Sequence, residues 1–545
     1  MKDKKLKIIP LGGLGEVGKN MTVYEYEHQI LIVDAGMMFP DNDMIGIDYI
    51  IPDFDYVKQR ADQVVGIIVT HAHEDHSGAI GHLLEHVNAP IYSAPLTNGM
   101  IKNKLNRRSF TKEVALIDVH AGETVQIGPF KVDFFHVCHS VPDGLGIGID
   151  TPVGLVVHTG DYKFDHTPVD GLPTDYWKLA EFSSRGTLAL LSDSTNAEVP
   201  GWTQSERVVE AGFKRVFQQA KGRIIIATFA SLISRMQQVL DVSKEHNRKV
   251  CFTGFSMIEN ARIAKELGYL RYDESQVVSI DVALSMPESK VVLLVTGSQG
   301  EPTSILGRLA NGTNRQFSIQ AGDTVVISAH PIPGNEEAVY RAVNRLMEKG
   351  AEVVYSDIED VHVSGHASQE EMKLLLHLVR PRYLIPIHGE LRMLRQHKRL
   401  AMEIGMDERQ IALVENGRVI EFKHGELKLG ERIPGGYVFV DGTGVGDVDR
   451  TTMRDRELLS QDGVVLVNLF LDKDNGTYKD IEILSRGFIS QDESKELFDE
   501  LQKRVIRLTT SPSKNMQKEI QNLSISFLNE ETKRRPFIFV SITKV

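Results

Sequence analysis

The sequence predicts an α/β protein of several domains. Its 545 residues exceed what one hydrophobic core usually supports, so two to four domains are expected. Unbroken apolar runs, such as residues 64–69, have the length and composition of strands that are buried on both faces. Several runs end in histidine or aspartate, and the ends of strands are where α/β folds place their chemistry.

Short strands are predicted at the start of the chain, over residues 6–9, 21–27 and 29–33. A glycine-rich stretch, residues 11–19, lies between the first two strands. Phosphate-binding and dinucleotide-binding loops both require a helix after the glycines, whereas a strand follows here. We therefore interpret the stretch as a structural turn that carries backbone close to a site.

The strongest chemical signal follows the strand at residues 64–69, where His71, His73, Asp75 and His76 fall within six residues. Neutral imidazoles and a carboxylate are the usual ligands of zinc or manganese. A helix is expected from Ser77, so the loop would be held rigidly at both ends. A chance grouping of polar loop residues is the weaker explanation, because such a cluster has no packing purpose.

Later strands also end in residues able to bind metal. Neighbouring residues on a strand point to opposite faces, so Cys138 and His139 do not readily bind one ion, and we favour His139. This residue follows a strand expected over residues 125–135. Asp161 and Asp193 end two further strands, and a bridging aspartate suits a two-metal site.

Around residue 204 the pattern changes to alternating helix and strand, which predicts an inserted α/β domain. Turns rich in small residues follow three of its strands, at residues 228–235, 296–302 and 328–335. Such turns suit a phosphate or a sugar, although ordinary turn chemistry explains each of them equally well alone.

The order of strand end, histidine and helix recurs at residues 361–370 and again at residues 383–390, where His388 lies at the tip. Histidines at several strand ends predict one shared edge. A hairpin turn is expected near Asn416 and Gly417. After a linker, the pattern predicts strand, strand, helix, helix and strand over residues 464–471, 479–489, 493–507, 516–528 and 537–544.

Composition limits the partners and the compartment. The formal net charge of −12 gives no global support for nucleic-acid binding, and each basic cluster, including residues 102–112, is more readily a solvated helix face. The only two cysteines lie far apart, which fits a reducing cytosol. No signal sequence or membrane-spanning run is found, so a cytoplasmic protein without membrane contact is expected.

With these residues collected, the sequence resembles the metallo-β-lactamase superfamily, whose HxHxDH signature stands here at residues 71–76. The inserted segment, Asp193, His366 within Ser-Gly-His-Ala-Ser and His388 within Ile-His-Gly-Glu resemble the β-CASP nucleases. Essentially the whole chain is similar to the bacterial ribonuclease J family. The resemblance implies an αββα sandwich with an inserted β-CASP α/β domain and a small C-terminal α/β domain.

The expected domain boundaries follow from this resemblance and from the pattern changes. The sandwich would take residues 1–203 and 360–445, and the insertion residues 204–359. A linker would take residues 446–457. Residues 458–545 carry no catalytic constellation, so we assign them to oligomerisation or RNA guidance.

The resemblance also implies site residues. One metal ion would be held by His71, His73, His139 and Asp161. A second ion would be held by Asp75, His76, Asp161 and His388. A structural calcium ion would lie near Gly46, Asp48 and Asp441. The phosphates of the substrate would contact Ser231, His362, Val363, Ser364, Gly365 and His366. The chain departs from the family pattern at Ala72, Leu232 and Ser234.

The function implied by the resemblance is metal-dependent hydrolysis of RNA with two zinc or manganese ions. Catalytic roles would fall to Asp75, His366 and Asp193, with His366 as the general acid. The family is expected to act as a 5′-to-3′ exonuclease that prefers a 5′-monophosphate and as an endonuclease, in mRNA decay and rRNA maturation.

The implied partners are single-stranded RNA with a 5′-monophosphate and a second copy of the chain, as a homodimer or homotetramer. A paralogous subunit or an RNA-degradation complex is a further implied partner. One alternative is a catalytically weak RNA-binding scaffold paired with an active paralogue, but every expected ligand is present. The other alternative is a thioester or lactam hydrolase, whose family lacks the inserted domain.

Overall fold

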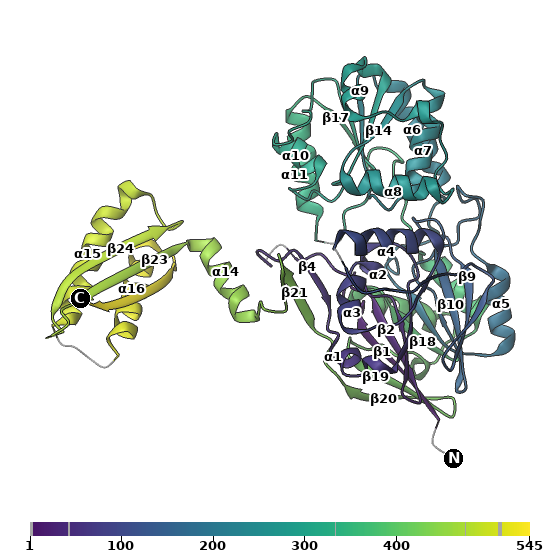
Figure 1. Cartoon of the computed structure of the whole chain (residues 1–545), viewed down its shortest axis with the longest axis horizontal. Coiled ribbons are helices and arrows are strands. Elements are labelled where there is room, and N and C mark those ends of the chain that lie inside the picture. Colours follow the sequence, from purple (N-terminus) through teal and green to yellow (C-terminus); the bar gives the residue numbers. More distant parts are fainter. Residues whose placement is uncertain (1–3, 42–43, 109, 333, 475, 511–514) are drawn as a thin grey trace. The chain divides into compact units, whose positions relative to one another are not determined.

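A computed structural model describes residues 4–41, 44–108, 110–332, 334–474, 476–510 and 515–545. The chain forms two compact units. The first comprises Met1–Phe39 and Ile50–Val438, and the second comprises Pro40–Tyr49 and Phe439–Val545. Figure 1 labels the helices and strands of both units.

Two sheets form the centre of the first unit. The eight-stranded sheet has the order β20 (Glu426–Arg432), β19 (Arg418–Lys423), β1 (Lys5–Gly12), β2 (Met21–Tyr26), β3 (Gln29–Val33), β5 (Val64–Ile68), β6 (Ile91–Ser93) and β7 (Leu116–Asp118). The six-stranded sheet has the order β18 (Tyr383–Ile387), β12 (Thr187–Asp193), β11 (Gly154–His158), β10 (Leu145–Thr151), β9 (Phe130–His136) and β8 (Thr124–Ile127).

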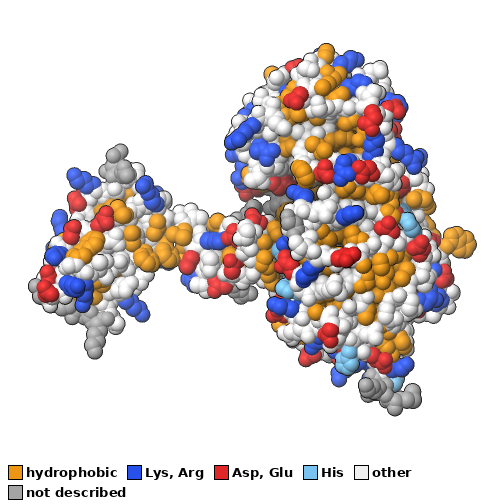
Figure 2. Space-filling view, viewed as in Figure 1, with side chains coloured by type: hydrophobic (Ala, Val, Ile, Leu, Met, Phe, Trp, Pro, Cys, Tyr) orange, Lys and Arg blue, Asp and Glu red, His pale blue; other side chains and the backbone are white. Residues whose placement is uncertain are grey.

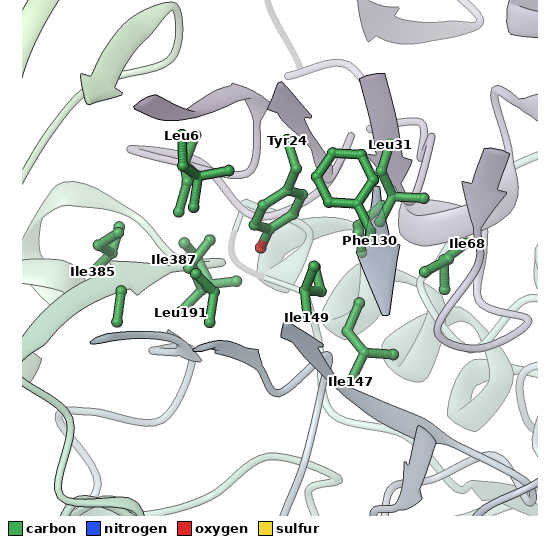
Figure 3. Packing of buried hydrophobic residues seen from close by; sticks show 14 of the residues in the cluster. Leu6, Tyr24, Leu31, Ile68, Phe130, Ile147, Ile149, Leu191, Ile385 and Ile387 are labelled. Atoms are coloured by element: carbon green, nitrogen blue, oxygen red, sulfur yellow. The ribbon is translucent and has the colours of Figure 1, made fainter. Parts of the chain in front are cut away.

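Hydrophobic side chains from the facing sides of these two sheets form one core. Leu6 and Leu31 of the first sheet and Ile147 and Leu191 of the second belong to the same fully buried cluster (Figure 3). Burying such side chains is the main favourable term in folding, at about 1.5–3 kcal/mol for each one. This packing fixes the strand ends of both sheets relative to one another.

Helices cover the outer sides of the two sheets. Leu179 of α5 (Tyr176–Arg185), Leu375 of α12 (Gln369–Val379) and Leu400 of α13 (Leu391–Glu403) pack on the six-stranded sheet. The eight-stranded sheet is covered by α3 (Ile80–His86) and α4 (Pro95–Arg107), while α1 (Asp55–Lys58) and α2 (Glu74–Ser77) are short. The order helix, sheet, sheet, helix confirms the predicted αββα sandwich.

The inserted segment forms a parallel sheet with helices on both faces. Its order is β14 (Lys249–Phe252), β15 (Val291–Val295), β13 (Ile224–Ala227), β16 (Thr324–Ile327) and β17 (Glu352–Tyr355). One face is covered by α6 (Arg207–Gln219), α7 (Ile233–Glu245) and α8 (Phe255–Glu266). The other is covered by α9 (Ile280–Ser285), α10 (Ile305–Asn311) and α11 (Glu336–Glu348). Burial on both faces explains the unbroken apolar strands.

The second unit contains the predicted C-terminal elements. Its sheet has the order β24 (Tyr478–Arg486), β23 (Val464–Leu471) and β25 (Phe537–Lys544). Val467 of β23 packs against Leu501 of α15 (Gln491–Thr509) and Ile520 of α16 (Met516–Thr532). In this unit the end of β21 (Tyr437–Asp441) pairs antiparallel with the short strand β22 (Gly444–Val445). None of the helices in the described part of the chain is long and apolar enough to cross a membrane.

Four local predictions were wrong. The helix expected from Ser77 begins at Glu74, so Asp75 and His76 lie inside its single turn. The strand expected over residues 125–135 is a hairpin of β8 and β9. The linker over residues 446–457 contains part of the helix α14 (Arg450–Asp462). Asn416 and Gly417 precede β19, whose hairpin with β20 turns at residues 424–425.

Candidate metal centre

The predicted ligands come from loops at strand ends and meet at one edge of the sandwich. His71 and His73 follow β5, while His139 follows β9. Asp161 follows β11 and His388 follows β18. Their convergence confirms the prediction of one shared edge. The sequence separations of up to 317 residues are bridged by the two packed sheets.

The first group of four comprises His71, His73, His139 and Asp161. Nδ1 of His73 lies 3.1 Å from Nε2 of His71 and 3.1 Å from Nε2 of His139. Both of these Nε2 atoms are 3.6 Å from Oδ2 of Asp161. Ligands placed tetrahedrally around zinc at its usual bond lengths are about 3.3 Å apart, so this donor set fits such an ion.

The second group comprises Asp75, His76, Asp161 and His388. Nε2 of His76 is 3.2 Å from Oδ1 of Asp161 and 3.5 Å from Oδ2 of Asp75. Nε2 of His388 is 3.3 Å from the same Asp75 oxygen. Oδ1 of Asp161 and Nε2 of His388 are buried, and among the described residues neither makes a well-directed hydrogen bond, although Nδ1 of His388 lies 2.9 Å from Oδ1 of Asp161. Buried lone pairs left without hydrogen bonds fit a metal site.

The pKa values of the histidines show how charge is distributed in the cluster. Burial lowers the pKa of His73 to about 4 and that of His139 to about 3, so these rings are neutral ligands at neutral pH. Burial also acts against the charged forms of His76 and His388, but nearby carboxylates, Asp161 foremost, raise their pKa values overall. The carboxylates thus favour positive charge at the second group.

Asp34 orients His76, although no role in the site was predicted for it. Its Oδ2 accepts a hydrogen bond of 2.7 Å from Nδ1 of His76, so Nε2, which lies 3.1 Å from Nδ2 of Asn20, is the ring atom that faces the second group. Its Oδ1 accepts the backbone N–H of Thr70 at 2.8 Å. Asp34 has a left-handed φ of 63°. The available signal was its position at the end of β3.

The glycine-rich stretch holds the backbone beside His388, as the interpretation of it as a structural turn predicts. The N–H of Gly15 donates to the carbonyl of Gly389 at 2.9 Å, and the N–H of Gly389 donates to that of Gly13 at 3.2 Å. A Cβ atom on Gly12 would lie 1.8 Å from the carbonyl oxygen of Lys19. The approach to Lys19 requires glycine at position 12, and the backbone hydrogen bonds of Gly13 and Gly15 position the turn that carries His388.

A third group of donors joins Asp193 and His366 to Asp161 and His388. Nδ1 of His366 is 2.8 Å from Oδ2 of Asp193. Burial opposes protonation of His366, but the Asp193 carboxylate raises its pKa overall. Oδ1 of Asp193 accepts hydrogen bonds from the hydroxyl and the N–H of Thr195, which fix the carboxylate. Because Nδ1 of His366 is bound by Asp193, Nε2 of His366 is the ring atom available to a substrate.

The remaining predicted substrate contacts lie in two loops. Gly365 accepts a hydrogen bond from His139, and Oγ of Ser364 accepts one from Nδ2 of Asn196. Nδ1 of His362 is buried and has no hydrogen-bond partner in the described structure. The side chain of Val363 is buried in the core of the insertion, so only its backbone is available. Ser231 is partly exposed in the turn after β13.

The departures from the family pattern have different consequences. Ala72 is buried beside Leu96 and Met100, and both flanking histidines still reach the first group. Leu232 is 2 % exposed and Ser234 is partly exposed, at the start of α7. An apolar side chain at position 232 offers no hydrogen bond beside Ser231.

The residues predicted to bind calcium lie in the second unit and already have partners. Oδ2 of Asp48 accepts the N–H of Gly442 at 2.8 Å. Asp441 is paired at 2.5 Å with Arg456, whose guanidinium also donates to the carbonyl of Ile45. Because a positive charge is already beside Asp441, this arrangement does not favour calcium, and we derive no role for that ion.

Comparisons with known proteins agree with this geometry. Residues 14–196 match the metallo-beta-lactamase superfamily and residues 221–346 the ribonuclease J beta-CASP domain. Residues 350–411 match the RNA specificity domain of Zn-dependent metallo-hydrolases, and residues 451–545 the ribonuclease J C-terminal domain. The chain is 39% identical to ribonuclease J2 of Bacillus subtilis over 99% of both chains. It belongs to the ribonuclease J family.

Other relatives extend the comparison. This ribonuclease J family member is 42% identical to ribonuclease J of Synechocystis, over 92% of this chain and 78% of that one. A crystal structure of a protein of unknown function from Enterococcus faecalis is similar in fold, with a TM-score of 0.54 and 17% identity. The similar region covers 76% of this chain and 100% of the Enterococcus chain. The chain is therefore a hydrolytic ribonuclease whose fold implies a metal cofactor.

Proposed function

We propose that this ribonuclease uses two zinc or manganese ions to cleave single-stranded RNA. It acts as a 5′-to-3′ exonuclease that prefers a 5′-monophosphate and also as an endonuclease. The observation that carries the proposal is the pair of four-ligand groups that share Asp161, with the Asp193 and His366 pair beside them. When bound, such ions activate water and neutralise charge on phosphoryl oxygens.

The residues of the chain hold and orient the reacting groups. His71, His73 and His139 would supply neutral nitrogen ligands, whereas Asp75 would add negative charge to the second group. Asp161 presents one carboxylate oxygen to each group, so it would be a ligand of both ions. Asp34 and Gly365 hold two of the ligand rings through their second nitrogen.

The leaving 3′-oxygen of the RNA needs a proton, and His366 is placed to give it. Asp193 binds Nδ1 of His366 and favours the protonated ring, so Nε2 would carry a proton toward the substrate. Such a positioned general acid typically contributes about 10²- to 10⁴-fold to the rate. The product then keeps a 5′-phosphate.

Selection of the 5′ end would depend on the turn at Ser231 and the loop from His362 to His366. A monophosphate fits a tight pocket, whereas a triphosphate adds charge and bulk. Leu232 removes a polar group that the family usually has beside Ser231. We therefore expect a weaker preference for monophosphate than in relatives with the polar residue.

We assign the protein to mRNA decay and rRNA maturation in the cytoplasm, acting as a homodimer or homotetramer through residues 458–545. A paralogous subunit or an RNA-degradation complex would be its further partners. These assignments follow from the resemblance to the ribonuclease J family; the names of the relatives support only a ribonuclease of this family.

Digestion of RNA labelled at either end tests the activity. Release of mononucleotides from the 5′ end is expected from monophosphorylated RNA, together with internal cuts in single-stranded regions. Equal rates of hydrolysis of monophosphorylated and triphosphorylated RNA would refute the proposal that a pocket selects the 5′-monophosphate. The scaffold alternative is correct if the isolated wild-type protein binds RNA but cleaves it no faster than the double variant Asp75→Asn, His76→Ala does.

A further inference from the structure

Two neighbouring helices carry side chains that the proposed reaction does not use. The helices α4 and α8 run antiparallel, because Gly99 lies against Ile263 while Arg107 lies over the ring of Phe255. Figure 1 shows α8 of the insertion above α4 of the sandwich. Lys and Arg side chains, interspersed with hydrophobic and acidic ones, appear on this face in Figure 2.

Phe255 is unusually open for a large aromatic side chain. The guanidinium carbon of Arg107 lies 4.6 Å from the centre of its ring, yet 58% of the residue remains exposed. Ile258, one turn further along α8, is 48% exposed. The contact with Arg107 therefore covers part of the ring and leaves the rest free for a planar ligand.

The cations at this surface differ in whether a carboxylate already neutralises them. Lys104 is paired with Glu74, Arg108 with Glu85, and Arg262 with Glu259 and Glu266. Arg107 and Lys102 are exposed, and within the part of the chain that the structure describes neither forms an ion pair. An unpaired cation beside an open aromatic ring, with a second unpaired cation on the same helix, favours an anionic partner with flat rings.

We propose that Lys102, Arg107, Phe255 and Ile258, here called the α4–α8 strip, bind the body of a single-stranded RNA substrate. A base would stack on Phe255, and Arg107 and Lys102 would contact phosphates. Every base has a flat face, so this mode of binding does not depend on sequence. The inference rests on the proposed nuclease function, because it assigns a second contact to the same substrate.

Both helices of the strip are fixed to the catalytic loops. Nζ of Lys104 lies 2.9 Å from Oγ of Ser77 and 3.0 Å from Oε2 of Glu74, in the turn that carries Asp75 and His76. On the other side, Nδ2 of Asn260 donates to the carbonyl of Ala230, next to Ser231. The strip therefore keeps a fixed position relative to the site. An RNA long enough to reach both is bound more tightly than a short one.

Hydrolysis kinetics of 5′-monophosphorylated RNAs of about four and about 20 nucleotides test the strip, because single-strand sites typically span about 4–16 nucleotides. Phe255→Ala is expected to raise KM for the long RNA by about 5- to 150-fold, the loss of one stacked base. The KM of the short RNA and both kcat values stay as in the wild type. Arg107→Ala is expected to reduce the salt dependence of log KM for the long RNA by about 0.7.

Variants of matched size separate stacking from packing. Phe255→Tyr should retain wild-type KM, whereas Phe255→Leu should behave like Phe255→Ala. Arg262→Ala, which removes a paired cation from the same helix, should leave KM and the salt dependence unchanged. Thermal unfolding verifies that each variant is folded.

Two results would contradict the proposal that the α4–α8 strip binds RNA. Wild-type KM in Phe255→Ala or in Phe255→Leu would do so, as would an unchanged salt dependence in Arg107→Ala. The surface would then serve packing or a protein partner. A wild-type enzyme that fails to hydrolyse even the short RNA would instead refute the nuclease function itself, so the two failures are distinguishable.

Discussion

His139 donates its Nδ1 proton to the carbonyl oxygen of Gly365 over 2.8 Å, across a separation of 226 residues in the sequence. A Cβ atom on Gly365 would lie 2.6 Å from that nitrogen. We therefore expect Gly365→Ala to displace the imidazole and to lower metal affinity and RNA hydrolysis by about 10- to 100-fold. Metal analysis and hydrolysis rates measure both effects.

Gly436→Ala is the matched control, because a Cβ atom there would meet no other atom within 4 Å. It should bind metal and cleave RNA as the wild type does. Full metal content in Gly365→Ala would mean that His139 keeps its place without this contact.

Asp34→Asn tests the orientation of His76. Asparagine tolerates the left-handed φ of 63° at this position, so the backbone is preserved. The loss of the carboxylate that binds Nδ1 of His76 is expected to weaken metal binding by about 10- to 100-fold. Competition with a zinc-binding dye measures the affinity. Asp62→Asn, at an exposed position, is the control, and equal affinities in the two variants would contradict the role.

Removal of metal should both stop hydrolysis and destabilise the fold. A ligand that binds only the native state stabilises it by about 2.7 kcal/mol when its concentration is 100 times its Kd. Treatment with a chelator is therefore expected to lower the unfolding temperature, and added zinc or manganese should restore it. The double variant Asp161→Asn, His388→Ala, which lacks ligands, should not respond to the chelator. Undiminished hydrolysis in the chelator would rule out a metal-dependent reaction.

A pH-dependent contact joins the sandwich to the insertion. Asp143 accepts the hydroxyl proton of Tyr269. Burial raises the pKa of Asp143, and the bond from Tyr269 only partly offsets this. Because the pKa of Asp143 is higher in the native state than in the unfolded state, its protonated carboxyl group stabilises the fold. This stabilisation is complete at a pH below the pKa of the unfolded state and is lost as pH rises through the pKa of the native state.

Asp143→Asn should abolish that loss. The free energy of unfolding of Asp143→Asn, relative to the wild type, is therefore expected to increase as pH rises above about 3.9, the usual pKa of an aspartate. Asparagine also tolerates the φ of 67° found at Asp143. Urea unfolding at several pH values measures the difference. Tyr269→Phe should raise the pKa of Asp143 further and extend the loss to higher pH, and a decrease in the relative stability of Asp143→Asn would contradict the raised pKa.

Much of the fold could be predicted because it depends on local patterns. β23 and β25 span the predicted residues 464–471 and 537–544, since alternating and continuous apolar runs directly reflect which faces are buried. The strand at residues 64–68 was recognisable for the same reason, whereas the helix expected from Ser77 begins at Glu74. The helix α5 was not predicted, because its apolar positions are few and mixed with polar ones.

Residues outside the recognised motifs could not be assigned from local signals. Asp34 ends β3, but only the folded chain shows that its carboxylate lies 2.7 Å from the ring of His76. Arg456 carries no motif, and its pairing with Asp441 depends on how α14 folds back on residues 45–48. Such contacts follow from the packing of distant segments.

By itself, the sequence determined most of the strands and the residue types able to bind metal, because burial and ligand chemistry are properties of short segments, while the resemblance to a family implied the layers. Only the tertiary structure decided which nitrogen of each histidine faces the site and which side chains lie behind it. It also decided that α4 and α8 lie together. These features depend on distances between segments that are far apart in the chain, and the packed core alone fixes such distances.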